Sequence, residues 1–171
     1  MVSDEVLEIT QRLVDVFEQF VLRKVDNDLF CVHGRAQVEG LMRKFVEANS
    51  PIEFVLPAFP FKSPSRNKVL GTLPDYGEYY SLFVLNSLCE TLKSFYEPGG
   101  CVRLVSDGSV YHDLIGVSEE DFHAYDDEIR RMGREFSHLK FHGIRDLLTD
   151  AEYALWTTDK QGFFEENLIG F

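Results

Sequence analysis

Three short apolar segments, separated by stretches with helical periodicity, constrain the fold more than any other feature of the sequence. They are residues 52–58 (IEFVLPA), 101–107 (CVRLVSD) and 139–144 (LKFHGI). Each is apolar without strict alternation, which is typical of a strand buried on both faces. Such strands alternating with helices indicate a parallel sheet covered by helices. The sequence therefore predicts an α/β protein with a mostly parallel sheet and helices on both faces.

The helices are predicted from apolar residues that recur at steps of three and four. They span residues 4–24, 35–48, 75–96, 119–136 and 145–156. Asp75 and Glu78 have the spacing of a capping box at one helix start, and Ser118 opens the helix near 119 in a similar way. Residues 110–117 (VYHDLIGV) are predicted to form a strand or an extended stretch.

A single domain, residues 1–171, is expected from a chain of this length, which can bury a substantial core. Residues 1–50 form its helical N-terminal segment, and residues 51–145 form the α/β core. The tail, residues 146–171, ends on apolar residues and is expected to begin a C-terminal half that the chain lacks. The fold is therefore expected to be incomplete at that end.

The acidic composition excludes several classes of partner. With 17 basic and 29 acidic residues the net charge is −12, which disfavours nucleic acid and anionic membranes. The N-terminus lacks the cations of a signal peptide, and no apolar run approaches the ~20 residues of a membrane span. Three widely spaced cysteines, Cys31, Cys89 and Cys101, indicate reduced thiols. We therefore expect a cytoplasmic protein.

The loop at residues 59–75 (FPFKSPSRNKVLGTLPD) runs against this acidic background. No acidic residue occurs from Phe54 to Pro74, and the loop holds Lys62, Arg66 and Lys68. Five of the six prolines of the chain lie between Pro51 and Pro74, and prolines lower the entropic cost of ordering a loop. The loop is thus predicted to be stiff and positive.

This loop has two interpretations. In one it binds a small anion, because its side chains supply convergent donors and the following helix presents its N-terminus. Asp75 at that N-terminus would repel the anion. In the other it is an exposed connector whose cations balance an acidic surface. No phosphate-binding glycine motif is present, and the residue types leave both interpretations open.

Two further carboxylates follow the second predicted strand. Asp107, within Ser106-Asp107-Gly108, could orient an amine or act as a base, or could belong to a tight turn in which the glycine takes a positive φ. Asp113 lies in an otherwise apolar run. The histidines lack a metal-binding pattern, and dinucleotide and hydrolase motifs are missing, so neither a metal nor a cofactor is predicted.

Residues 59–117 together resemble the isocyanide synthase family, also called the pyoverdine/dityrosine biosynthesis family. The matching elements are FPxKSP, NKVLGxLPD, LNSLC, the PGG turn and SDGxVxxDLIGV. The resemblance implies a Rossmann-like N-terminal domain and a cofactor-free enzyme that converts the amino group of an amino acid into an isonitrile. The added carbon would come from ribulose 5-phosphate. A fungal branch modifies tyrosine for spore-wall dityrosine, and a downstream oxygenase would be the pathway partner.

The resemblance also suggests roles for individual residues. The side chains assigned to the phosphate and sugar hydroxyls are those of Lys62, Ser63, Arg66, Asn67, Lys68 and Ser106. Lys62 could instead form a Schiff base if neighbouring cations lowered its pKa. Asp107 and Asp113 would bind the substrate ammonium or move protons. The alternative is a truncated, non-catalytic paralogue that binds a sugar phosphate or has a regulatory role.

Overall fold

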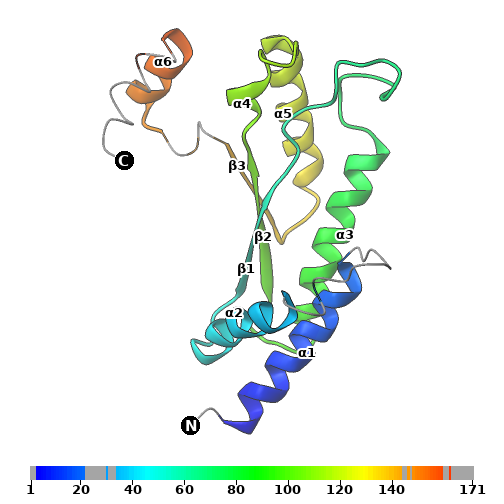
Figure 1. Ribbon diagram of the computed structural model, residues 1–171, viewed down its shortest axis with the longest axis vertical. Coiled ribbons are helices and arrows are strands. Elements are labelled where there is room, and N and C mark those ends of the chain that lie inside the picture. Colours follow the sequence, from blue (N-terminus) through cyan, green and yellow to red (C-terminus); the bar gives the residue numbers. More distant parts are fainter. Residues whose placement is uncertain are drawn as a thin grey trace.

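The chain folds into a three-stranded parallel sheet with helices before, between and after its strands (Figure 1). The structure, a computed structural model, describes residues 3–21, 30, 34–143, 146, 148–159 and 162. The strands are β1 (Ile52–Pro57), β2 (Gly100–Ser106) and β3 (Leu139–Gly143). The helices are α1 (Asp4–Phe20), α2 (Arg35–Glu47), α3 (Tyr76–Lys93), α4 (Gly108–Tyr111), α5 (Glu119–Gly133) and α6 (Asp150–Thr158). The predicted α/β class is confirmed.

The strand order β1-β2-β3 determines where the connecting helices lie. Helix α3 joins β1 to β2, and α5 joins β2 to β3, each moving the chain one strand further in the same direction. Right-handed crossovers of this kind place both helices on one face of the sheet. Val102, Leu104 and Leu139 point to that face and pack with Leu82 of α3 and Ile129 of α5.

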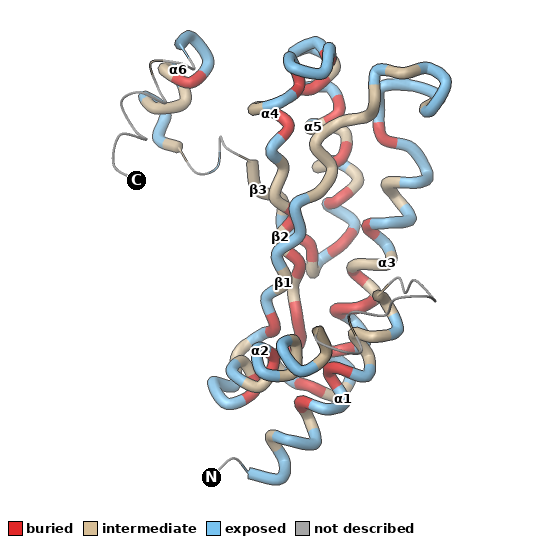
Figure 2. The backbone as a smooth tube through the Cα atoms, viewed as in Figure 1, coloured by how far each residue is buried: buried red, intermediate tan, exposed pale blue. Residues whose placement is uncertain are grey.

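The other face of the sheet is more exposed among the described residues (Figure 2). Val55 of β1 is 64% exposed. Beside it, the Arg103 guanidinium on β2 donates to both carboxylate oxygens of Glu53, at 2.6 and 3.3 Å. The crossover helices thus supply most of the core on one side, and an ion pair across two strands lies on the other.

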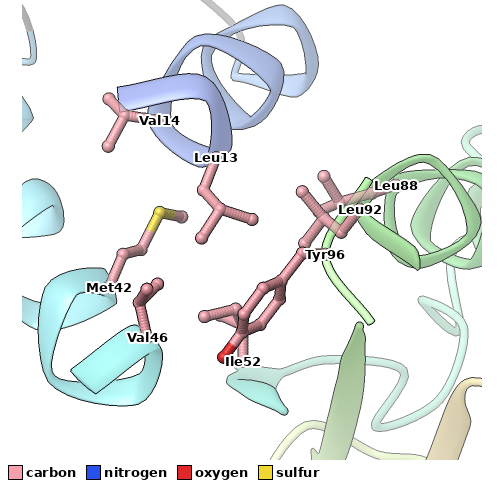
Figure 3. Packing of buried hydrophobic residues seen from close by; sticks show 8 residues of the cluster. All are labelled: Leu13, Val14, Met42, Val46, Ile52, Leu88, Leu92 and Tyr96. Atoms are coloured by element: carbon pink, nitrogen blue, oxygen red, sulfur yellow. The ribbon is translucent and has the colours of Figure 1, made fainter. Parts of the chain in front are cut away.

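A second core cluster closes the N-terminal end of the sheet. Leu13 of α1, Met42 of α2, Leu92 of α3 and Ile52 of β1 point toward one another there (Figure 3). Tyr96 packs beside them, and its hydroxyl donates to the carbonyl oxygen of Ser50 at 2.7 Å. Helices α1 and α2 therefore anchor the end of the molecule opposite to the strand carboxyl ends (Figure 1).

The predicted capping groups are present where the sequence places them. Asp75 and Glu78 form a full capping box at the start of α3, and the Ser118 hydroxyl accepts from the backbone N–H of Asp121. A further capping box, between Thr149 and Glu152, begins α6 five residues later than predicted. Parts of three predictions lie outside the described residues: Cys31, the end of the first helix beyond residue 21, and residues 147, 160, 161 and 163–171 of the tail.

The prediction of an extended segment over residues 110–117 is wrong. Residues 108–111 form the short helix α4, and a turn follows, in which the backbone N–H of Val117 donates to the carbonyl oxygen of His112 at 2.8 Å. Gly116 closes this turn with φ of 77°. Local hydrogen bonds therefore replace the strand pairing that the apolar composition suggested. No helix among the described residues is long and apolar enough to cross a membrane.

Candidate functional site

The candidate site lies at the carboxyl ends of the parallel strands, where ligands bind in open α/β sheets. Two segments meet this end of the sheet in Figure 1, the loop after β1 and helix α4 after β2. Asp146 is the third contributor, because its carboxylate accepts from the backbone N–H of Gly143 at the end of β3. The site residues predicted from the sequence lie either in the loop after β1 or between the end of β2 and the turn after α4. Asp146 was not predicted to contribute.

Lys62 fixes the loop against the start of α3. Its side chain is only 8% exposed, and Nζ lies 2.5 Å from Asp75 Oδ2 and 3.1 Å from Glu78 Oε2. The same two carboxylates cap the helix, because Asp75 accepts from the N–H of Gly77 and Glu78 accepts from the N–H of Asp75. One lysine thus joins the loop to a capping box.

The electrostatics of this cluster keep Lys62 charged. Burial disfavours the ammonium, but the hydrogen bonds to Asp75 and Glu78 outweigh it, and the pKa of Lys62 is raised. The ammonium in turn lowers the pKa of Asp75, together with the N–H of Gly77. A Schiff base would require cations around Lys62 and a lowered pKa, whereas its neighbours here are carboxylates. The repulsion that Asp75 would exert on an anion is offset by Lys62.

The tip of the loop carries charge that no described residue neutralises. Arg66, Asn67 and Lys68 are exposed. They form a turn in which the N–H of Lys68 donates to the carbonyl oxygen of Ser65 at 2.9 Å, and the backbone N–H of Ser65 donates to the hydroxyl of Ser63. No ion pair to Arg66 or Lys68 occurs within the described ranges. The tip is therefore a local positive surface on an acidic protein.

Gly108 holds the beginning of the loop against α4. A Cβ at this position would lie 2.3 Å from the carbonyl oxygen of Pro60 and 2.7 Å from the ring of Phe122. The predicted reason for this glycine, a positive φ in a tight turn, is wrong, because Gly108 is the first residue of α4. Close approach of two backbones explains the glycine instead. The hydroxyl of Ser106 bridges the same two segments, contacting the carbonyl oxygen of Phe59 and the N–H of Gly108.

Two neighbouring cavities open between α4, α5 and α6. One has a volume of about 260 Å³ and is lined in part by Ser106, and the other, of about 310 Å³, is lined in part by Asp113. Asp107 is exposed at the N-cap of α4. The two cavities share lining residues, which are Ser109, Phe122, His123 and Tyr153. The structure thus brings Ser106 and Asp113 to adjoining cavities and places Arg66, Asn67 and Lys68 on the loop tip.

Arg130 lines the smaller cavity and was not predicted from the sequence. Its guanidinium donates to Asp126 at 2.9 Å and to Asp146 at 3.1 Å. Burial opposes the charge, but the two carboxylates outweigh it and raise the pKa of Arg130. Asp146 also accepts from the N–H of Gly143, so this pair joins α5 to the end of β3. His123, Asp126 and Arg130 are spaced three and four residues apart, so they share one face of α5. This spacing was the sequence feature that could have identified Arg130 as a site residue.

Metal binding has no support among the residues that the structure describes. No three His, Cys, Asp or Glu side chains are grouped there in a way that could hold an ion.

The chain is similar to proteins of one family. The family model described as "Pyoverdine/dityrosine biosynthesis protein" matches residues 42–168. An L-tryptophan isonitrile synthase of Fischerella ambigua, AmbI2, is 43% identical over 111 residues, covering 64% of this chain and 34% of that protein. An L-tyrosine isonitrile synthase of Pseudomonas aeruginosa is 44% identical over 105 residues, covering 60% of this chain and 32% of that protein.

A more distant relative and a solved structure agree with these matches. The spore wall maturation protein DIT1 of Saccharomyces cerevisiae is 33% identical over 138 residues, covering 78% of this chain and 26% of that protein. The crystal structure of PvcA from Pseudomonas aeruginosa superimposes with a TM-score of 0.79 at 33% identity, covering 95% of this chain and 52% of that chain. The chain spans about a third or less of the length of the curated relatives it matches.

Proposed function

Because the chain belongs to the pyoverdine/dityrosine biosynthesis family, we propose that it forms part of an isonitrile synthase. Its reaction would convert the amino group of an amino acid into an isonitrile. Two relatives named as isonitrile synthases, for L-tryptophan and L-tyrosine, support an aromatic substrate. Ribulose 5-phosphate would supply the carbon, with its ketone condensing with the amine before the sugar is cleaved.

The observation that carries this proposal is the positive loop tip on an acidic protein. A sugar phosphate is an anion, and a chain with a net charge of −12 needs a local cationic surface to hold it. Arg66 and Lys68 supply that surface, because neither is neutralised by an ion pair within the described ranges. Asn67 adds hydrogen-bond donors between them.

The remaining predicted residues take supporting roles. Lys62 would hold the loop in place and add to its field, since its ammonium is already bound by two carboxylates. Ser63 and Ser106 would contact sugar hydroxyls. Asp113 lines the larger cavity, where its carboxylate would attract the substrate ammonium, and Asp107 would assist at the same strand end.

A thermal-stability experiment tests the sugar-phosphate assignment. Ribulose 5-phosphate at a hundredfold excess over its Kd should raise Tm by about 5–10 °C, because a ligand bound only to the folded state stabilises it. Arg66→Met and Lys68→Met should remove most of this rise. Lys44→Met is the matched control, since Lys44 is exposed on α2 at the opposite end of the sheet. Equal stabilisation in all variants would contradict the loop assignment.

Product analysis tests the reaction itself. The protein is incubated with ribulose 5-phosphate and L-tyrosine or L-tryptophan, and the mixture is examined for an isonitrile by mass spectrometry. An isonitrile is the expected result. Stabilisation by ribulose 5-phosphate without product would limit the function of this chain to binding the sugar phosphate.

A further inference from the structure

His112 is a buried histidine with one ring nitrogen already bound. The residue is 8% exposed, and its Nδ1 lies 3.1 Å from the carbonyl oxygen of Val117. A carbonyl oxygen only accepts hydrogen bonds, so Nδ1 carries the proton of the neutral ring. Nε2 is therefore left with a lone pair and acts as an acceptor.

His112 lines the larger cavity, and we infer that its Nε2 is the ring nitrogen accessible there. Within the described part of the chain it has no hydrogen-bond partner, yet it is not among the polar atoms sealed away from solvent. His112 lines the cavity of about 310 Å³. Its ring is held in place by stacking on Phe122, with the ring centroids 5.3 Å apart and the planes at 12°. A rigid acceptor thus faces a space large enough for a small molecule.

The walls of this cavity combine aromatic rings with carboxylates. Phe122, Tyr153 and Trp156 contribute rings, and Asp113 and Glu119 contribute negative charge. Rings favour an aromatic body, while carboxylates and a neutral imidazole favour a group that donates hydrogen bonds and carries positive charge. An aromatic amine has both parts.

We propose that this cavity binds the aromatic amine and that Nε2 of His112 is the group that accepts the proton of its ammonium. The inference rests on the proposed function and adds the base that its first step requires. An ammonium has no lone pair, so it must lose a proton before nitrogen can attack a ketone. One N–H bond breaks, its electron pair stays on the substrate nitrogen, and the proton forms a bond to Nε2. Nothing is oxidised or reduced.

Other titratable groups share the cavity with His112. The titratable side chains that line the same cavity are Asp113, Glu119, His123 and Tyr153. The ring of His123 lies 3.7 Å from Glu119 at the exposed rim. Asp113 and Glu119 line the same cavity as His112, so the cavity carries negative charge that complements a cationic substrate.

Substitution of His112 by asparagine separates its structural contact from its proposed role. The amide nitrogen of asparagine can occupy the position of Nδ1 and donate to Val117, but the side chain has no group at the position of Nε2. The chain contains one tryptophan, Trp156, which lines this cavity and reports occupancy by its fluorescence. Tyramine and 4-ethylphenol serve as probes, because they share a ring and differ in the amine.

Tyramine should change Trp156 fluorescence saturably and bind more tightly than 4-ethylphenol. His112→Asn should reduce the preference for tyramine about tenfold, the usual effect of one lost hydrogen bond to a charged group. His138→Asn, at a half-buried histidine near the other end of β3, should leave it unchanged. An unchanged preference in His112→Asn, or no response to tyramine, would overturn the inference.

Nitrogen NMR of the unsubstituted protein gives a measurement that needs no variant to fold. With labelled histidine, the Nε2 signal of His112 should move toward the protonated position as tyramine saturates the cavity. A stationary signal at saturation would show that another group accepts the proton. If these results fail while ribulose 5-phosphate still stabilises the protein through Arg66 and Lys68, this inference falls and the proposed function stands.

Discussion

The two exposed cations of the loop and the buried one have different environments although they lie within seven residues. Lys62 is only 8% exposed and contacts Asp75 and Glu78, whereas Lys68 is exposed and has no ion pair within the described ranges. The first is bound to the protein and the second is available to a ligand. The same residue type therefore has a structural role at one position and a proposed binding role at the other.

Substitution of each lysine by methionine should distinguish these roles. Lys62→Met removes the partner of two carboxylates and should lower the free energy of unfolding by about 1–3 kcal/mol, because the Glu78 carboxylate is mostly buried. Lys68→Met should change it by less than about 0.5 kcal/mol. Urea denaturation measures both. An equal loss in the two variants would show that the Lys62 cluster contributes nothing specific.

At this scale the sequence predicted residue types well and their partners poorly. The absence of acids between residues 54 and 74 was sufficient to identify the loop as positive. The pairing of Arg130 with Asp146 joins a helix to a strand end, and no local spacing encodes it. His112 was discounted because it fits no metal motif. Its significance depends on which ring nitrogen faces Val117 and which faces a cavity, and that is set by the turn after α4.

At the scale of elements, α5 and β3 approach closely at one glycine. A Cβ on Gly133, the last residue of α5, would lie 2.1 Å from the ring of Phe141 on β3. Gly40 lies within α2, and a Cβ there would meet nothing within 4 Å. Two helical glycines therefore differ in why they are present: one is required by packing and the other is not.

Alanine at these two glycines should have opposite effects. Gly40→Ala should raise the free energy of unfolding by about 0.5–1 kcal/mol, because alanine is the better helix former. Gly133→Ala should lower it by about 1–3 kcal/mol, because the added methyl group displaces Phe141. Thermal unfolding of the two variants in parallel checks the signs. Stabilisation by Gly133→Ala would mean that α5 and β3 can separate at no cost.

Element prediction succeeded where the signal was local and failed where it was not. The three strands and the start of α3 follow from apolar runs and a capping box, both readable over a few residues. Residues 110–117 are mostly apolar, but Val117 pairs with His112 within the same turn, and no described strand pairs with them. Placement of both crossover helices on one face depends on strand order, which the sequence pattern does not specify.

For the whole molecule, the ionisable groups define a pH range of stability. Asp15, Asp75 and Asp146 have lowered pKa values, each with a positively charged side chain beside it, so their stabilising effect is present above about pH 4 and is lost on acidification. Cys89 behaves in the opposite way. It is fully buried, and burial raises the pKa of its thiol to about 12.

Cys89 should therefore contribute to the alkaline limit of stability, together with Tyr125 and Tyr96, whose pKa values burial also raises. The unfolded chain releases the Cys89 proton near pH 9, while the folded protein retains it until about pH 12. The contribution of Cys89 to the free energy of unfolding is therefore fully present below about pH 9 and is lost as the pH rises. Between about pH 9 and 11 this group alone contributes a slope of about −1.4 kcal/mol per pH unit. Cys89→Ala should remove that contribution and leave the loss of stability at acid pH unchanged. Urea denaturation across the range measures both limbs, and an unaltered alkaline slope would mean that Cys89 is reached by solvent in the folded protein.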